Sequence, residues 1–171
     1  TGAKLVVCPI DQNGDIELEA FNSLLSPRTK IVSISHISNV LGSINPIEIM
    51  IKNAKKYGAI TIVDAAKSIA HLQIDVTQLG CDFLTFSAHK IHGPTGTGIL
   101  YGKYEHLTAM PPFMTGGDMI KTVSFEQTTF NSPPYKFEAG TPNISGVIGL
   151  GYAIDYLSQF SWDEKLNYEN S

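Results

Sequence analysis

Cysteine, charge and long apolar runs are all scarce in this sequence. Its two cysteines, Cys8 and Cys81, supply neither a disulfide framework nor the spacing of a metal site, which favours a reducing, cytoplasmic location and predicts no bound metal. Charged residues make up only 16% of the chain and the net charge is -4, so no basic surface for nucleic acid or anionic lipid is expected. No apolar run reaches the ~20 residues of a membrane span, and the start lacks the pattern of a signal peptide. We therefore expect neither a nucleic-acid nor a membrane partner.

The sequence does contain a regular alternation of strand-like and helix-like segments. Hydrophobic residues form 43% of the 171, enough to build the core of one globular domain. The alternation predicts a mostly parallel α/β sheet with helices on both faces. Strands are expected at residues 1–10, 31–35, 60–64, 83–87 and 98–102, and helices at 17–25, 46–57, 65–70, 76–80 and 146–160.

Lys90 lies where a buried strand-like run meets a glycine-rich loop. A lysine held at such a position can lose its proton and form a Schiff base with an aldehyde, which is how pyridoxal 5'-phosphate (PLP) is anchored. Ser87 and His89 flank it and are suited to bind a phosphate. The alternative is a surface lysine at a strand end, with the glycines of the loop serving only turn geometry.

Asp64 ends a second run of β-branched residues and is followed by small residues. The run is typical of a buried parallel strand, and ligands of open α/β sheets bind at the carboxyl ends of such strands. An aspartate at this place can keep the pyridine nitrogen of PLP protonated, so that the ring accepts electrons. The alternative is that Asp64 caps the next helix.

A third segment, residues 30–46, has the same order of apolar strand and polar tip, and it adds Asn39 to Asp64 and Lys90. With these residues in view, the chain resembles the group II cysteine desulfurases, the SufS-type, selenocysteine lyase-like branch of the class V, fold-type I PLP enzymes. The resemblance covers nearly the whole chain. Its motifs are HISNVLG at 36–42, VDAA at 63–66, FSAHKIHGPTG at 86–96 and FEAGTPN at 137–143.

The resemblance implies a role for each matching residue. Lys90 corresponds to the Schiff-base lysine, and Asp64 corresponds to the partner of the pyridine nitrogen. Ser87 and His89 match positions that bind the PLP phosphate. Hydroxyl, imidazole and backbone N–H donors at a strand-to-loop turn are suited to that anion.

Three further residues belong to the implied cofactor site. Asn39 matches a residue beside the phenolic oxygen of PLP and the substrate carboxylate, and Thr141 matches a phosphate contact given to the neighbouring subunit of a homodimer. Lys67 departs from the family, which usually has glutamine there to donate to the phenolic oxygen. A lysine can also donate, as a point charge that stabilises the phenolate. The alternative is that Lys67 turns outward and the contact is lost.

The activity implied by the resemblance is conversion of L-cysteine, or selenocysteine, to L-alanine with a persulfide left on the enzyme. The sulfur would supply iron–sulfur cluster assembly through an acceptor protein of the SufE or SufU type. Two alternatives remain. One is another class V PLP enzyme, such as a kynureninase-like hydrolase or an epimerase, and the other is a non-catalytic folding or dimerisation fragment.

Compared with the family, the chain is expected to be an internal fragment. Residues 1–145 would belong to the large PLP-binding domain, with an extended arm at about 113–137, and residues 146–171 would form a helix leading toward an absent small domain. The nucleophilic cysteine and the arginine that binds the substrate carboxylate are expected outside the chain. Cys8 and Cys81 lie in apolar surroundings, where a small hydrophobic role is favoured.

Overall fold

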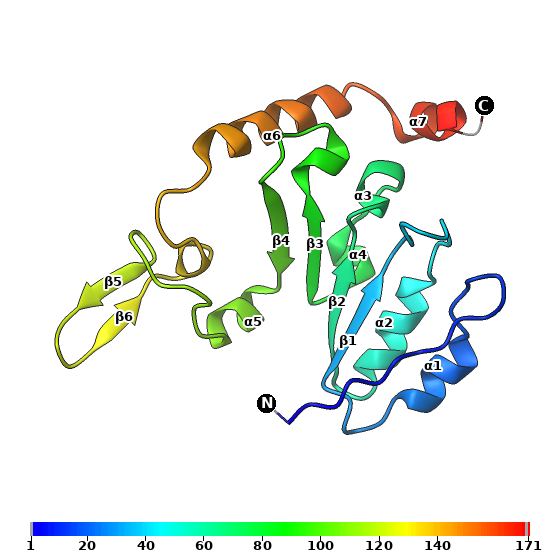
Figure 1. Ribbon diagram of the computed structural model, residues 1–171, viewed down its shortest axis with the longest axis horizontal. Coiled ribbons are helices and arrows are strands. Elements are labelled where there is room, and N and C mark those ends of the chain that lie inside the picture. The colour runs from blue at the N-terminus through cyan, green and yellow to red at the C-terminus, as the bar shows by residue number, and fades with distance from the viewer. Residues whose placement is uncertain (1, 170) are drawn as a thin grey trace.

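A four-stranded sheet organises the computed structural model, which describes residues 2–169 and 171. The strand order is β1 (Ile31–Ser35), β2 (Ile60–Asp64), β3 (Phe83–Ser87) and β4 (Gly98–Gly102). The first three strands run parallel, and β4 is antiparallel to β3 (Figure 1). All four strands have the bounds predicted from the sequence, and the mostly parallel α/β class is confirmed.

The remaining elements surround this sheet and extend beyond it. The described helices are α1 (Leu18–Leu24), α2 (Ile47–Lys55), α3 (Ser68–His71), α4 (Val76–Leu79), α5 (Tyr104–Ala109), α6 (Ile144–Leu157) and α7 (Trp162–Glu169). Two short 3-10 helices are η1 (Ala88–Ile91) and η2 (Tyr135–Phe137). A hairpin is formed by β5 (Ile120–Val123) and β6 (Thr128–Phe130).

The main core lies between one face of the sheet and helices α1 and α2. Val32 and Ile34 of β1 alternate with exposed residues, and their neighbour Val63 in β2 is fully buried. These side chains pack with Phe21 of α1 and Met50 of α2 in one hydrophobic cluster. Burial of such side chains on a single face is what the two-residue period of a strand produces. The helices therefore hold the strand ends in fixed relative positions.

The second face of the sheet is covered mainly at Phe83, whose ring stacks with His106 of α5 at a centroid distance of 5.8 Å. Ile31 and Leu100, on the same face, are each 59% exposed. Helices thus contact both faces of the sheet, although most of the helical packing is on the first.

The expected opening strand is the main error of the sequence prediction. Residues 2–9 form no strand, and Thr1 lies outside the described residues. Only an isolated bridge between Ile10 and Ile16 follows, around a turn closed by Asp11. Leu5 and Val7 are 87% and 76% exposed, so the apolar composition of this stretch is not matched by burial. A strand needs a neighbouring backbone, which local sequence does not supply.

The arm expected at about 113–137 corresponds to the β5–β6 hairpin and the loops beside it. The hairpin projects away from the sheet, at the left of Figure 1. After it, the chain returns through η2 to α6, which runs across the carboxyl edge above β4 and β3 in this view. Helix α6 begins at Ile144 and ends at Leu157, so the helix expected at 146–160 is present and shifted by two to three residues.

Candidate active site

The carboxyl ends of three parallel strands bring the predicted residues to one edge of the sheet. Ser35 is paired in register with Asp64, and Asp64 is paired with Thr85, two residues before Ser87. The backbone N–H of His36 donates to the carbonyl of Asp64 at 2.9 Å, which ties the ends of β1 and β2 together. An edge of this kind is where ligands of open α/β sheets bind.

Asp64 is exposed at this edge and held by a local turn. Its Oδ1 accepts a hydrogen bond from the backbone N–H of Ala66 at 2.8 Å. Its second oxygen has no hydrogen-bond partner among the residues described. Because Lys67 occupies the N-cap position of α3, the alternative in which Asp64 caps that helix is not observed.

Lys90 lies on the 3-10 turn η1, whose first and last residues are buried and whose two central residues are exposed. Ala88 and Ile91 are 0% and 5% exposed and pack with Leu150 of α6, whereas His89 and Lys90 both face solvent. The buried pair anchors the turn, so the backbone beneath the lysine is fixed while its side chain is presented at the edge.

Glycines in the loop after Lys90 allow two backbone segments to approach closely. A Cβ on Gly93 would lie 2.9 Å from the carbonyl oxygen of Ala88, and one on Gly98 would lie 2.8 Å from that of Phe86. Both distances are shorter than a side chain tolerates. At these two positions, turn geometry is sufficient to explain the glycines.

Nitrogen groups without a hydrogen-bond partner in the described part of the chain follow the carboxyl ends of β1, β2 and β3. Lys67 is half-buried, and neither it nor Lys90 makes a hydrogen bond or ion pair within the described part of the chain. Nδ1 of His36 is buried and has no hydrogen-bond partner. Burial lowers the pKa of His36 against the opposing effect of Glu48, which favours the neutral ring. This unpartnered buried nitrogen becomes visible only in the structure.

Two further predicted site residues lie in exposed connecting segments. Asn39 is exposed in the turn between Ser38 and Gly42. Thr141 is exposed in the segment between η2 and α6. Their proposed contacts are therefore still predictions.

The two cysteines have properties of structural residues. Cys81 is fully buried, and burial raises the pKa of its thiol, with Asp82 acting in the same direction. Burial also raises the pKa of the Cys8 thiol, together with Glu17. A neutral thiol is a poor nucleophile. Across residues 2–169 and 171, no group of three potential ligands could hold a metal ion, and no helix is long and apolar enough to cross a membrane.

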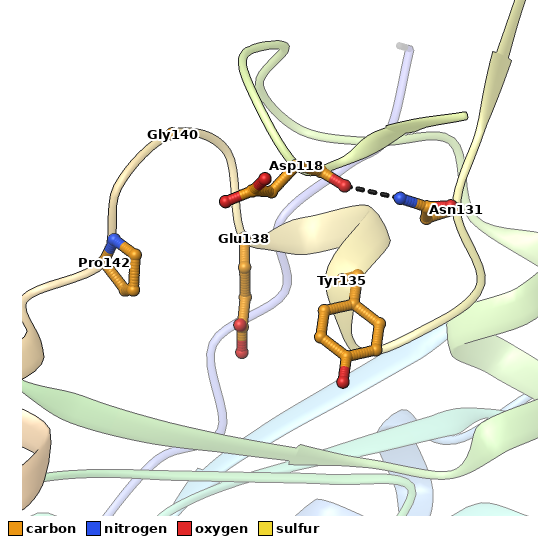
Figure 2. Close-up of a pocket in the computed structure, with 6 residues that line it drawn as sticks. All are labelled: Asp118, Asn131, Tyr135, Glu138, Gly140 and Pro142. Atoms are coloured by element: carbon orange, nitrogen blue, oxygen red, sulfur yellow. Dashed lines mark hydrogen bonds between the residues drawn. The ribbon is translucent and has the colours of Figure 1, made fainter. Parts of the chain in front are cut away.

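A separate cavity of about 440 Å³ lies in the arm rather than at the sheet edge (Figure 2). It is lined by Asp118, Asn131, Tyr135, Glu138, Gly140 and Pro142. The side-chain amide of Asn131 donates to the carbonyl oxygen of Asp118. None of the predicted site residues lines this cavity, although Thr141 is adjacent in sequence.

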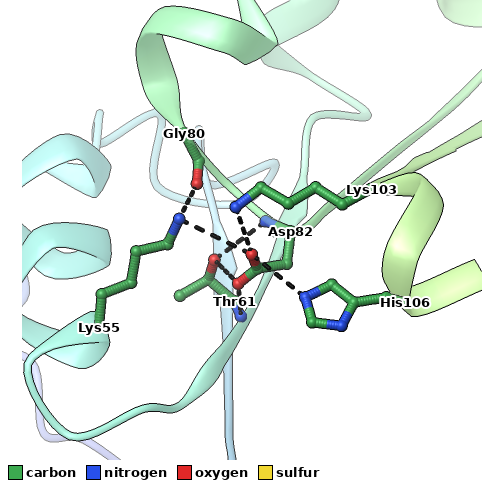
Figure 3. Close-up of polar contacts among 6 residues, drawn as sticks. All are labelled: Lys55, Thr61, Gly80, Asp82, Lys103 and His106. Carbon is green, nitrogen blue, oxygen red and sulfur yellow. Dashed lines mark hydrogen bonds and ion pairs between the residues drawn. The ribbon is translucent and has the colours of Figure 1, made fainter. Parts of the chain in front are cut away.

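A polar cluster lies at the opposite, amino edge of the sheet (Figure 3). Asp82 is 5% exposed and accepts hydrogen bonds from the N–H and the hydroxyl of Thr61, both at 2.8 Å, and from Lys103 at 2.7 Å. Lys55 and His106 approach the same carboxylate at 3.7 and 3.5 Å. The cluster joins α2, β2, β3 and α5 far from the predicted cofactor residues, and it is structural in character.

The residues at the carboxyl edge fit PLP. The edge combines a carboxylate, a hydroxyl, an imidazole and two ammonium groups, which match the pyridine nitrogen, the phosphate and the phenolic oxygen of that molecule. The unpaired ammonium groups of Lys67 and Lys90 are groups that an anionic ligand would satisfy.

Comparisons with known proteins identify the family of the chain. A family model described as aminotransferase class-V matches residues 1–171. The chain is 48% identical over 164 residues to a probable cysteine desulfurase of Xylella fastidiosa strain Temecula1, covering 96% of this chain and 39% of that protein. It is 50% identical over 172 residues to a cysteine desulfurase of Enterobacter sp. strain 638, covering 100% of this chain and 42% of that protein.

Solved structures give the same result. The cysteine desulfurase CsdA of Escherichia coli superposes with a TM-score of 0.93 at 41% identity, covering 96% of this chain and 41% of that one. The apo cysteine desulfurase of Thermococcus onnurineus NA1 gives a TM-score of 0.88 at 40% identity, covering 94% of this chain and 40% of that one. The chain therefore spans about two fifths of the length of these relatives.

Proposed function

The chain belongs to the aminotransferase class-V family, and from this premise we propose that it is part of a PLP-dependent cysteine desulfurase of the group II, SufS type. The reaction converts L-cysteine to L-alanine. The sulfur atom passes to an enzyme thiol, which becomes a persulfide.

One observation carries the proposal. Asp64 ends β2, and Lys90 follows the end of the neighbouring parallel strand β3. Lys90 lies on η1, whose first and last residues, Ala88 and Ile91, are buried. The carboxylate and the amine thereby share one edge with Ser87 and His89. Class V aminotransferases and cysteine desulfurases depend on PLP, and the donor set at this edge fits that cofactor.

We assign the residues toward PLP as follows. The Lys90 amine would bind the aldehyde carbon, and Asp64 would pair with the pyridine nitrogen. Ser87 and His89 would hold the phosphate, and Lys67 would donate to the phenolic oxygen, with Asn39 on the substrate side. Thr141 would bind the phosphate of the partner subunit in a homodimer. When bound, PLP supplies an electron sink for the carbon that loses a proton.

The chain's own groups then have distinct tasks. Asp64 would keep a proton on the pyridine nitrogen, and this role is supported by the absence of a hydrogen bond to its second oxygen within the described residues. The Lys90 amine would act as the base that takes the proton from the substrate α-carbon and would return a proton to form alanine. Because the thiols of Cys8 and Cys81 have raised pKa values, we place the attacking thiolate in a part of the protein beyond these 171 residues.

The physiological role follows from the same family relationship. We propose that the persulfide sulfur is passed to an acceptor of the SufE or SufU type for iron–sulfur cluster assembly in the cytoplasm, and that selenocysteine is a second substrate. A kynureninase-like or epimerase activity is the alternative within the class, and it would release no sulfide or selenide.

The test uses the whole protein expressed with PLP. Borohydride reduction followed by peptide mass spectrometry should place PLP on Lys90, and L-cysteine should yield alanine and sulfide in the presence of a thiol reductant. Lys90→Ala should lose both the covalent PLP and the turnover, whereas Lys121→Ala on the exposed hairpin should keep them. Equal PLP incorporation in Lys90→Ala and wild type would refute the assignment, and turnover without sulfide would favour another class V activity.

A further inference from the structure

The start of α6 packs directly on the loop that follows Lys90. A Cβ on Gly146 would collide with Oγ1 of Thr97, and one on Gly149 would lie 2.7 Å from Cγ of Pro94. Further along the helix, Leu150 is 3% exposed and packs against Ala88 and Ile91 of η1. Successive turns of α6 therefore rest on the loop and on the lysine-bearing turn.

One side-chain amide joins the helix to the loop. Nδ2 of Asn143 donates to Oγ1 of Thr97 at 2.9 Å, across 46 positions of sequence. Oδ1 of the same residue accepts the backbone N–H of Gly146 at 3.1 Å and so caps α6. Asn143 fixes the helix start and the loop with the two ends of a single amide.

Thr97 continues this connection to the lysine turn. Its carbonyl oxygen accepts the backbone N–H of Ala88 at 2.9 Å. Ala88 is fully buried and begins η1, two residues before Lys90. The turn closes on its other side with the N–H of Gly93 donating to the carbonyl of Ala88, also at 2.9 Å. Two hydrogen bonds therefore link Asn143 to the backbone from which Lys90 projects.

We propose that Thr97 and Asn143 are positioning residues for Lys90, acting through the Asn143–Thr97–Ala88 relay. This inference rests on the proposed function, since it takes Lys90 to be the amine that captures PLP. Neither residue touches the cofactor in this assignment. Their effect is to hold the 3-10 turn in the orientation that directs the amine along the edge, because small misplacements of a reacting group cost large factors in rate.

The cleanest perturbation is Thr97→Val in the whole protein. The substitution preserves shape and the carbonyl bonded to Ala88, and it removes only the hydroxyl that accepts from Asn143. Thr97→Ser restores the hydroxyl and serves as the conservative rescue. Thr108→Val, on an exposed residue of α5, is the matched control for the change of residue type.

Two readouts separate positioning from a general structural effect. The first is the rate at which added PLP becomes fixed to Lys90 in apoprotein, by borohydride quenching and mass spectrometry. The second is the midpoint of the pH dependence of that rate. We expect Thr97→Val to slow capture roughly tenfold and to shift the midpoint. Thr97→Ser and Thr108→Val should stay within about twofold of wild type, and all three variants should remain folded by circular dichroism.

A second variant, Asn143→Ser, tests the same hydrogen bond in case Thr97→Val does not fold. Asn143→Ser keeps an oxygen that can cap α6 but is too short to reach Thr97. It should slow capture as much as Thr97→Val, and the double variant should be no slower than either single one, because both break the same relay.

The outcomes are distinguishable. Wild-type capture at Lys90 with an unchanged rate and midpoint in Thr97→Val would overturn the positioning role alone. Equal losses in Thr97→Ser and Thr97→Val would also overturn it, since the hydroxyl would then be irrelevant. Absence of PLP from Lys90 in wild type would overturn the proposed function, and the positioning role with it.

Discussion

Replacing Asp82 by asparagine tests whether the amino-edge cluster stabilises the sheet. The carboxylate accepts two hydrogen bonds from Thr61 through one oxygen and one from Lys103 through the other. Asparagine can satisfy Thr61 with its carbonyl oxygen, but its amide group then faces the Lys103 ammonium. The variant therefore keeps the shape of the site and loses the charge-assisted contact.

The expected loss can be estimated from the exposure of the partners. Removing one member of a fully buried ion pair costs about 3 to 5 kcal/mol. Here the Lys55 and Lys103 side chains are 35% and 28% exposed, so water solvates the cations left behind. We therefore expect Asp82→Asn to lower the free energy of unfolding by about 2 to 3 kcal/mol at neutral pH.

The measurement is urea unfolding followed by circular dichroism, with Asp155→Asn on the exposed surface of α6 as the matched control. The control should change the free energy of unfolding by less than about 0.5 kcal/mol. A loss in Asp82→Asn no larger than that of Asp155→Asn would refute the reasoning.

The pH dependence gives the same test a second arm. Burial alone would raise the pKa of Asp82, but the hydrogen bonds from Lys103 and Thr61 and the nearby Lys55 ammonium outweigh it and hold that pKa well below its usual range. A carboxyl group with a lowered folded-state pKa stabilises the fold above its unfolded pKa of about 4, and loses that contribution as pH falls toward the folded value. The difference between wild type and Asp82→Asn should be constant from pH 7 to 5 and shrink below about pH 4. A difference that stays constant down to pH 2 would contradict this account.

Three further substitutions test other contacts. Gly149→Ala should lower the free energy of unfolding by about 1 to 3 kcal/mol, because the new Cβ would lie 2.7 Å from the ring of Pro94. In the control Gly151→Ala the new Cβ meets nothing within 4 Å, so the free energy of unfolding should rise by up to about 1 kcal/mol. Equal urea midpoints for the two variants would contradict the close approach at Gly149. Lys136→Met should speed amide hydrogen exchange at the end of α5 roughly tenfold, because the Lys136 ammonium donates to three carbonyl oxygens there. The control Lys121→Met should leave this exchange unchanged. Unchanged exchange in Lys136→Met as well would argue against a stabilising role of these three hydrogen bonds. In the whole protein with PLP, Lys67→Gln should raise the midpoint pH at which the visible absorption band of the cofactor changes. The reason is that a cation near the phenolic oxygen favours the deprotonated form of the cofactor. A midpoint pH equal to that of wild type would mean that Lys67 faces solvent.

The strands could be predicted to the residue because each is a short β-branched or aromatic run with a polar or glycine boundary. β2, for example, begins after Gly58 and ends at Asp64. Parallel strand ends meet at one edge, so the common location of Asp64 and Lys90 also followed from the sequence. The predicted opening strand was wrong because Leu5 and Val7 are residues typical of strands, but no neighbouring backbone pairs with this segment in the structure.

The connections between distant segments could not be predicted. The bond between Asn143 and Thr97 joins two polar residues, each of which resembles an ordinary loop residue in its own window. Asp82 and Lys103 are likewise 21 positions apart, and their pairing depends on the antiparallel return of β4 beside β3. Contacts of this kind are decided by tertiary packing rather than by local pattern.

The close approaches at Gly93 and Gly98 bear on how related sequences should be interpreted. Both glycines are required because a Cβ would meet the backbone of residues 86–88, and that requirement is independent of any cofactor. A descendant of this fold that had lost its chemistry would therefore keep the glycine loop, while nothing in the packing would preserve the exposed Lys90. The glycine loop in a related sequence is therefore evidence for the fold. Evidence for catalytic activity requires that the lysine and Asp64 are both retained.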